Sequence, residues 1–152
     1  ARDAAGDRVL SIAETLAHDP YVTEAVAGPS TLDNVQSGIF SAGCAFNGCH
    51  AGASPSFGLD LSAGNAYAAT VNVPSVWNAN LSLIDPSSGN ADDSFLFIKV
   101  AAGANGGSYP GLLGGQMPPA GAVNADCLEG LKLWIQAGAS ASGMGWRKGS
   151  QP

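Results

Sequence analysis

Two cysteines and a histidine within one short stretch constrain this chain more than any other feature of its sequence. Cys44 and Cys49 are separated by four residues, and His50 follows the second cysteine directly. Two thiols beside an imidazole can hold a haem, because each thiol can add across one vinyl group while the imidazole reaches the iron from one face. Covalent attachment and axial ligation then occur in one local segment, whose backbone must take a defined shape.

The spacing of the two thiols leaves three interpretations open. The common haem signature has two residues between the cysteines, so four require a bulge, for which Asn47 and Gly48 tolerate left-handed backbone angles. A disulfide between the two thiols would instead close a small loop. A zinc site would use the same three side chains with Cys127 or His18 as the fourth ligand, although the sequence has no second close pair of ligands.

A methionine in a loop is the second informative feature. Met117 precedes two prolines and lies in residues 101–123, a glycine-rich segment that is predicted to be a long loop. Methionine usually fills a core, but a loop of this kind runs over the surface, and paired prolines stiffen it. With haem present, we therefore expect Met117 to be the second axial ligand. Such His/Met ligation raises the reduction potential and leaves no open position on the iron, which suits electron transfer.

Composition indicates a small, loop-rich domain and argues against two classes of partner. The 152 residues are within the usual size of one domain, and only 12% are charged, beside 21 glycines and 9 prolines. A net charge of −6 with six basic residues argues against nucleic acid, which needs clustered lysine and arginine. The sequence contains no run of about 20 apolar residues, so no membrane-spanning helix is predicted. The start at Ala1, without an initiator methionine, is typical of a processed, exported chain.

Apolar spacing predicts a mainly helical chain in three parts. Residues 1–30 form an N-terminal extension with a first helix, residues 31–139 form the main domain, and residues 140–152 form a polar tail that contains Met144. The expected helices are residues 4–17, a helix from a cap at Ser30 or Thr31 to Cys44, a short segment around residues 66–71, residues 94–100, and a last helix capped by Asn124 and ended by Gly138.

Several ordered motifs together resemble a known family. The motifs are Ile39-Phe40, Cys44 to His50, Gly58-Leu59-Asp60-Leu61, Ala66-Tyr67, Val71-Asn72-Val73-Pro74-Ser75, Ser94-Phe95-Leu96, Lys99, Gly115-Gln116-Met117-Pro118 and Leu133 to Ala139. This set, which covers residues 31–139, resembles the bacterial mono-haem cytochrome c domains with a C-x4-C-H site, which are common in exported planctomycete and other proteins. The resemblance implies a class I cytochrome c fold with terminal helices that cross near the haem, His50 as proximal ligand and Met117 as distal ligand.

The resemblance leaves some residues with no assigned role. Gly89-Asn90-Ala91 stands where the family usually has a Gly-Asp-Pro turn. Lys99 matches a family lysine, which is expected either near a haem propionate or as a solvated charge on a helix. Residues 1–30 and Cys127 have no counterpart in the family.

These observations predict an electron carrier with one covalent haem c rather than an enzyme, because no acid–base pair, nucleophile elbow or phosphate loop is apparent. We expect redox proteins as partners and a periplasmic or extracellular location. The alternative is a haem-carrying subunit of a larger or polymeric assembly, joined through residues 1–30, the tail or Cys127, although Cys127 can also be a small buried hydrophobe. The apolar residues expected around the haem are Leu59, Leu61, Tyr67, Phe95, Leu96 and Leu113.

Overall fold

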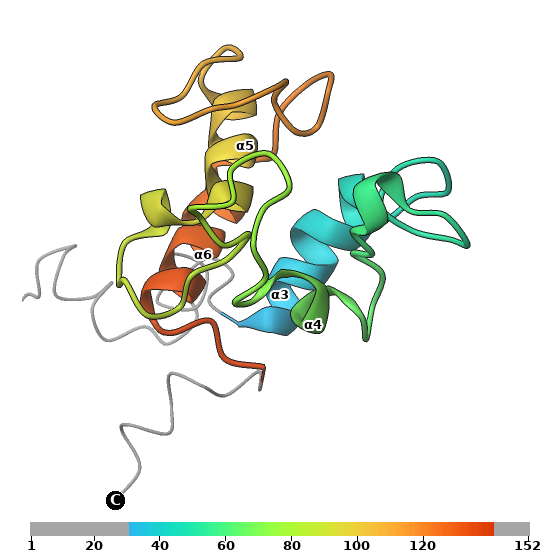
Figure 1. The fold of residues 1–152 in the computed structure, drawn as a ribbon, viewed down its shortest axis with the longest axis horizontal. Coiled ribbons are helices and arrows are strands. Elements are labelled where there is room, and N and C mark those ends of the chain that lie inside the picture. The colour runs from blue at the N-terminus through green and yellow to red at the C-terminus, as the bar shows by residue number, and fades with distance from the viewer. Residues whose placement is uncertain (1–30, 142–152) are drawn as a thin grey trace, which may run out of the picture.

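A computed structural model describes residues 31–141, which form a mainly helical domain (Figure 1). The predicted extension of residues 1–30 and the tail beyond residue 141 lie outside the described residues, as do His18 and Met144. Within the described part there is no β-strand, only three isolated bridges, so the mainly helical class is confirmed. The helices are α3 (Leu32–Val35), η1 (Gln36–Cys44), η2 (Ser56–Gly58), α4 (Ala66–Thr70), η3 (Ala91–Asp93), α5 (Phe95–Ala104) and α6 (Ala125–Gln136).

The helix that leads to the two cysteines begins at one of its predicted caps. The Thr31 hydroxyl accepts a hydrogen bond from the backbone N–H of Asn34 at 3.2 Å, which satisfies one of the free donors at a helix start. The first turn, α3, is α-helical, and the helix then continues as the π-helix η1. A π-helical turn is wider than an α-helical one and is frequent at functional sites. The chain therefore leaves this helix at Cys44, the first residue of the motif.

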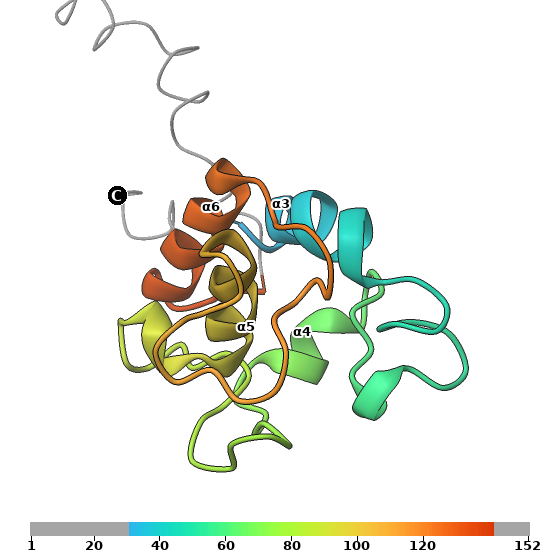
Figure 2. The same ribbon diagram turned by 90° about the horizontal axis from the view of Figure 1, so that it is seen from above.

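Helix α5 lies beside α6 (Figures 1 and 2). Every residue from 95 to 102 is buried, as expected for a helix that is apolar on all sides. The predicted helix over residues 94–100 is confirmed, but it continues to Ala104, because Ala101 and Ala102 are good helix formers that also pack inside. The long loop therefore begins at residue 105 rather than at residue 101.

Helix α6 closes the domain by packing against both α3 and α5 (Figure 2). Its predicted cap is confirmed, since the Asn124 side chain accepts from the N–H of Asp126 at 2.7 Å. The approach to the first helix is close at Gly38, where a Cβ would lie 3.2 Å from the sulfur of Cys127. The largest fully buried side chains of the resulting core are Trp134, Phe40, Phe95, Ile39, Ile84, Ile98, Leu131, Ile135 and Val35.

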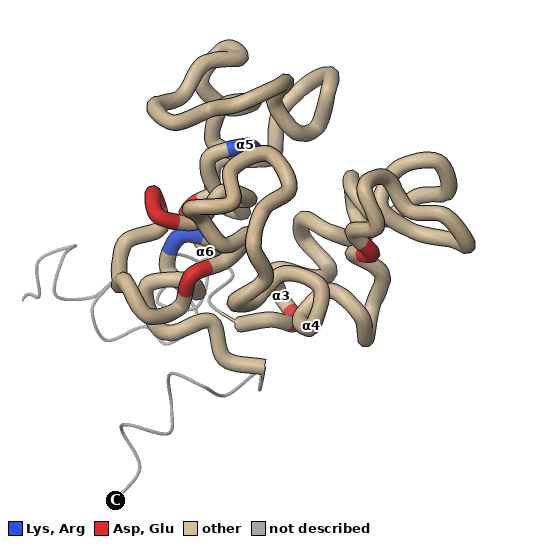
Figure 3. Tube along the Cα trace, viewed as in Figure 1, with Lys and Arg blue, Asp and Glu red and all other residues tan. Residues whose placement is uncertain are grey.

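Charged residues are few and scattered along the described chain (Figure 3). The lysines of this part are Lys99 on α5, which is buried, and Lys132 on α6, whose side chain is 44% exposed. No helix within residues 31–141 is long and apolar enough to cross a membrane.

Candidate functional site

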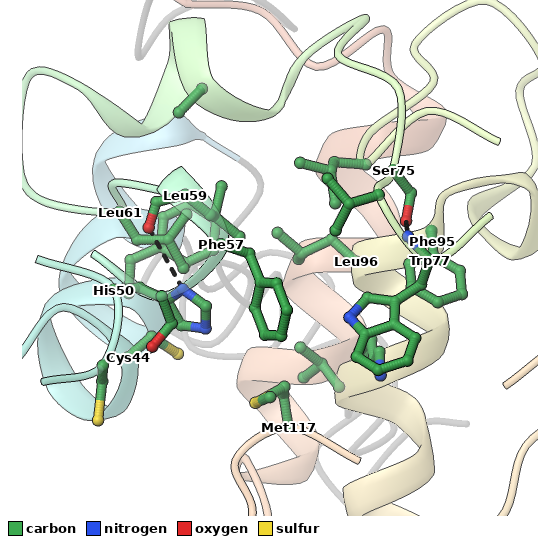
Figure 4. Close-up of a pocket in the computed structure, with 18 of the residues that line it drawn as sticks. Cys44, His50, Phe57, Leu59, Leu61, Ser75, Trp77, Phe95, Leu96 and Met117 are labelled. Atoms are coloured by element: carbon green, nitrogen blue, oxygen red, sulfur yellow. Dashed lines mark hydrogen bonds between the residues drawn. The ribbon is translucent and has the colours of Figure 1, made fainter. Parts of the chain in front are cut away.

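One cavity is lined by the four residues that the sequence singled out, of which Figure 4 labels Cys44, His50 and Met117. Cys44, Cys49 and His50 reach it from the end of η1 and the loop that follows. Met117 reaches it from the loop between α5 and α6. The cavity has a volume of about 310 Å³, which is within the usual range for sites that hold a small molecule.

The four residues between the cysteines form a loop that is held by its own backbone. The N–H groups of Phe46 and His50 both donate to the carbonyl of Cys44, at 3.0 and 3.1 Å. Gly48 has a φ of +83°, so the left-handed conformation expected at Asn47 or Gly48 occurs at the glycine. The bulge that the wider spacing requires is therefore present in the structure.

His50 is fixed at its backbone and at its ring. Its carbonyl accepts from the N–H of Leu61 at 2.8 Å, and its Nδ1 lies 3.2 Å from the carbonyl oxygen of Leu59 (Figure 4). A carbonyl can only accept, so this hydrogen bond requires the ring proton on Nδ1 and leaves the Nε2 lone pair for a metal. Contacts of this kind commonly orient the histidine ligands of metal sites.

The two thiols of the motif lie in different surroundings. Cys44 is buried, and this burial, with a smaller contribution from the neighbouring Cys49, raises the pKa of the Cys44 thiol to about 11. Cys49 is exposed, and neither thiol is joined in a disulfide, nor is Cys127. Within residues 31–141 no group of three or more His, Cys, Asp or Glu side chains could hold a metal ion, so the described residues provide no zinc ligand set.

Met117 lies in a loop that is fastened to α5. Its backbone N–H donates to the carbonyl of Lys99 at 2.9 Å. The Gln116 amide closes the loop by donating to two carbonyls of residues 118–121, at 3.1 and 3.0 Å. The loop lies so close to α5 that a Cβ on Gly103 would be 3.2 Å from the carbonyl oxygen of Met117. Contacts with a distant helix, rather than a helix or strand of its own, position this methionine.

Lys99 lies in the wall of the cavity and is only 7% exposed. Its ammonium group donates to the carbonyls of Leu113 and Gly115, at 2.5 and 2.7 Å, and lies 5.1 and 5.4 Å from the ring centroids of Trp77 and Phe95. Burial lowers the pKa of Lys99. The expectation of a solvated helix charge is therefore wrong, while contact with a haem propionate stays a prediction.

Two aromatic residues of the cavity were not found from the sequence. Phe57 and Trp77 are 66% and 48% exposed, and their rings meet edge to face with centroids 5.6 Å apart. In the view of Figure 4 the Phe57 ring lies between His50 and Trp77. The Ser75 hydroxyl accepts from the N–H of Trp77 at 3.1 Å and so shapes the turn that presents this side chain. The sequence did contain a sign of both residues, because each is a large aromatic residue that lies outside any apolar pattern typical of a core.

Some of the apolar residues predicted to surround the haem line the cavity, and others do not. Tyr67 does not line the cavity, because its side chain packs against the hydrophobic core. Leu113 does not line it either: this residue is 44% exposed, and its backbone carbonyl, rather than its side chain, contacts Lys99. The predicted residues that do line the cavity are Leu59, Leu61, Phe95 and Leu96.

The donor set of this cavity suits one kind of chemistry. Two cysteines, a histidine whose Nδ1 is hydrogen-bonded and a methionine line a space whose other walls are mostly aliphatic and aromatic. Imidazole and thioether are the axial pair of cytochromes c, and neighbouring thiols provide covalent attachment for the porphyrin. A scan of protein-family models, a search of curated proteins and a search of solved structures found no match to this chain.

Proposed function

We propose that this chain is a mono-haem c-type cytochrome that transfers electrons. In this proposal Cys44 and Cys49 attach the haem, and His50 and Met117 are its axial ligands. The observation that carries it is the convergence of all four side chains on one cavity. An accidental cysteine–histidine motif has no reason to share a cavity with Met117, the one methionine of residues 31–141, which is far away in sequence.

A class I cytochrome c fold is part of the same proposal. It is supported by the packing of α3 against α6, which brings the first and last helices of the described domain together. Gly38, on the η1 helix that continues α3, also approaches Cys127 of α6 closely. Only small side chains fit at such a contact, which also accounts for Cys127 as a small hydrophobe.

Each ligand-bearing segment has a separate task in this function. Haem iron supplies a one-electron couple. The hydrogen bond from Nδ1 of His50 to the carbonyl of Leu59 orients the ring and makes Nε2 a stronger donor. The Met117 thioether favours the reduced iron, and the apolar wall lowers the local dielectric. With both axial positions filled by side chains, no position is left for a substrate, so we propose an electron carrier and not an enzyme.

The proposed partners are redox proteins, and the proposed location is outside the cytoplasm, in the periplasm or the extracellular space. The net charge of −6 favours a partner whose docking surface is neutral or basic. The alternative, a subunit of a larger or polymeric assembly joined through residues 1–30, the tail or Cys127, is not favoured by the position of Cys127. Cys127 is partly buried, and its sulfur lies beside Gly38, where the residue packs against the core.

The test is the mass and the absorption spectrum of protein produced in a host that matures c-type cytochromes. We expect the mass of the polypeptide plus one haem, and c-type bands on reduction. The double variant Cys44→Ser/Cys49→Ser should have the polypeptide mass alone. If the unchanged chain has the mass of the bare polypeptide while a second c-type cytochrome from the same cells carries haem, the proposal is wrong.

A further inference from the structure

We propose that Lys99 is the positioning residue of the distal ligand, because it clamps the loop that presents Met117 to the cavity. This inference rests on the proposed function, since it matters only where Met117 binds iron. Lys99 itself is not assigned as a ligand. It acts through the backbone of residues 113–117.

The clamp holds the loop at two places. The ammonium group of Lys99 donates to the carbonyls of Leu113 and Gly115, and the backbone carbonyl of Lys99 accepts from the N–H of Met117. Among the described residues, every hydrogen bond between segment 113–117 and a helix goes to Lys99. The remaining side-chain bonds of the segment come from Gln116 and stay inside the loop. Lys99 thus fixes the loop both at Leu113 and Gly115, through its side chain, and at Met117, through its backbone.

The position of the ammonium group is itself fixed by its surroundings. It lies over the rings of Trp77 and Phe95, and it forms no salt bridge within residues 31–141. A buried cation without a carboxylate needs other electron-rich partners, and here these are two carbonyl dipoles and two ring faces. A Cβ on Gly114 would lie 3.0 Å from the lysine nitrogen, so the loop rests directly on it. Any shift of the ammonium group would move the loop.

The clamp predicts how easily Met117 can be displaced. A loop without secondary structure opens at low cost unless long-range contacts hold it. Replacing Lys99 by leucine keeps an apolar side chain in the cavity wall but removes both charge-assisted hydrogen bonds, so the loop should release Met117 more often. Covalent attachment and His50 lie on the other side of the cavity and should not change.

The experiment compares the matured holoproteins of the unchanged chain, Lys99→Leu, Lys99→Arg and the matched control Lys132→Leu. Leucine adds no sulfur that could itself bind the iron. Lys132 lies on α6, its side chain is 44% exposed, and its only ion pair in the described part is with Glu129, at 3.9 Å. Imidazole is added as a competing axial ligand, and the loss of the sulfur-to-iron charge-transfer band is followed. We expect Lys99→Leu to bind imidazole at least about tenfold more tightly than the unchanged chain. Lys99→Arg should lie between, and Lys132→Leu should behave as the unchanged chain.

A second background separates positioning from general destabilisation. In Met117→Ala there is no thioether to hold, so adding Lys99→Leu should leave imidazole affinity unchanged. An equal increase in both backgrounds, or no increase in either, would overturn the inference. If Lys99→Leu does not mature, the same comparison is made with Lys99→Gln. An unchanged chain without covalent haem would instead refute the proposed function, and a haem protein without the charge-transfer band would refute Met117 as ligand.

Discussion

The two sides of the cavity are built in different ways. On the His50 side, the hydrogen bonds of His50 itself go to Cys44, Leu59 and Leu61, all within one short stretch of chain. On the Met117 side, the loop has no helix or strand and is held by Lys99, from a helix that ends more than ten residues earlier. One ligand is therefore positioned by local structure and the other by tertiary contacts.

This difference indicates which ligand is easier to lose. The hydrogen bonds of His50 join residues that are close in sequence, whereas the Met117 loop depends on a packed α5 and on one buried lysine. Segments held by few long-range contacts open before the global unfolding of a domain. We therefore expect the distal ligand to be released under milder conditions than the proximal one, and the following changes test that order.

The largest effect is expected from exchanging the two ligands for alanine. His50→Ala removes the ligand that adjoins the attachment site, so most of the holoprotein should be lost or high-spin. Met117→Ala should keep the covalent haem, lose the sulfur-to-iron band and lower the reduction potential by on the order of 0.1 V or more. Mass spectrometry, absorption spectra and a redox titration measure these outcomes. A retained charge-transfer band in Met117→Ala would contradict the distal assignment.

The sequence predicted the His50 side better than the Met117 side, for the same structural reason. The cap at Thr31, the helix to Cys44 and the left-handed Gly48 follow from residues close to one another in the chain. The roles of Lys99, Phe57 and Trp77 depend on where distant segments meet, which spacing alone does not reveal. Helix α5 was predicted, but its end was not, because the alanines that extend it are stabilised by burial.

The second effect concerns the reactivity of the two thiols in haem-free polypeptide. Burial raises the pKa of Cys44 from 9.0 to about 11, so its thiolate should be about 100-fold rarer than that of an ordinary thiol near neutral pH. Cys49 is exposed and should be alkylated first. Timed alkylation followed by peptide mass spectrometry measures the two rates. In strong denaturant the rates should become equal. Equal rates without denaturant would show that the polypeptide alone does not bury Cys44.

The third effect tests the close contact between α5 and the distal loop. In Gly103→Ala the added methyl group would lie 3.2 Å from the carbonyl oxygen of Met117, so the loop must move away from the helix. We expect a weakened charge-transfer band and a loss of about 1 kcal/mol in the free energy of unfolding, because overpacking outweighs the better helix propensity of alanine. Gly115→Ala is the control, since its Cβ would meet no atom within 4 Å. If the two variants have the same band, the contact does not position Met117.

The smallest effect is expected from acid on the His50 side. The Asp60 carboxylate accepts from the N–H and hydroxyl of Ser62, at 2.9 and 2.6 Å, and these bonds, with one from Asn65, lower its pKa below 3.8. A carboxyl group whose pKa is lower in the folded than in the unfolded chain stabilises the fold at pH values above the unfolded pKa. This contribution is lost as the pH falls through the folded pKa. In urea unfolding we therefore expect Asp60→Asn to have a slightly smaller free energy of unfolding than the unchanged chain at neutral pH. Below about pH 4 this free energy should fall less in Asp60→Asn than in the unchanged chain.

Asp85 provides the matched control for this last prediction. It accepts from the N–H and hydroxyl of Ser87 at the same two distances, 2.9 and 2.6 Å, and its pKa is lowered for the same reason. Asp85→Asn should therefore make the free energy of unfolding less dependent on pH in acid, as Asp60→Asn does. Only Asp60 adjoins Leu59, whose carbonyl orients His50, so only Asp60→Asn should raise the pH at which the haem spectrum reports loss of the imidazole. If Asp85→Asn shifts that pH equally, the carboxylates affect the ligand through global stability, and local structure does not hold His50 independently.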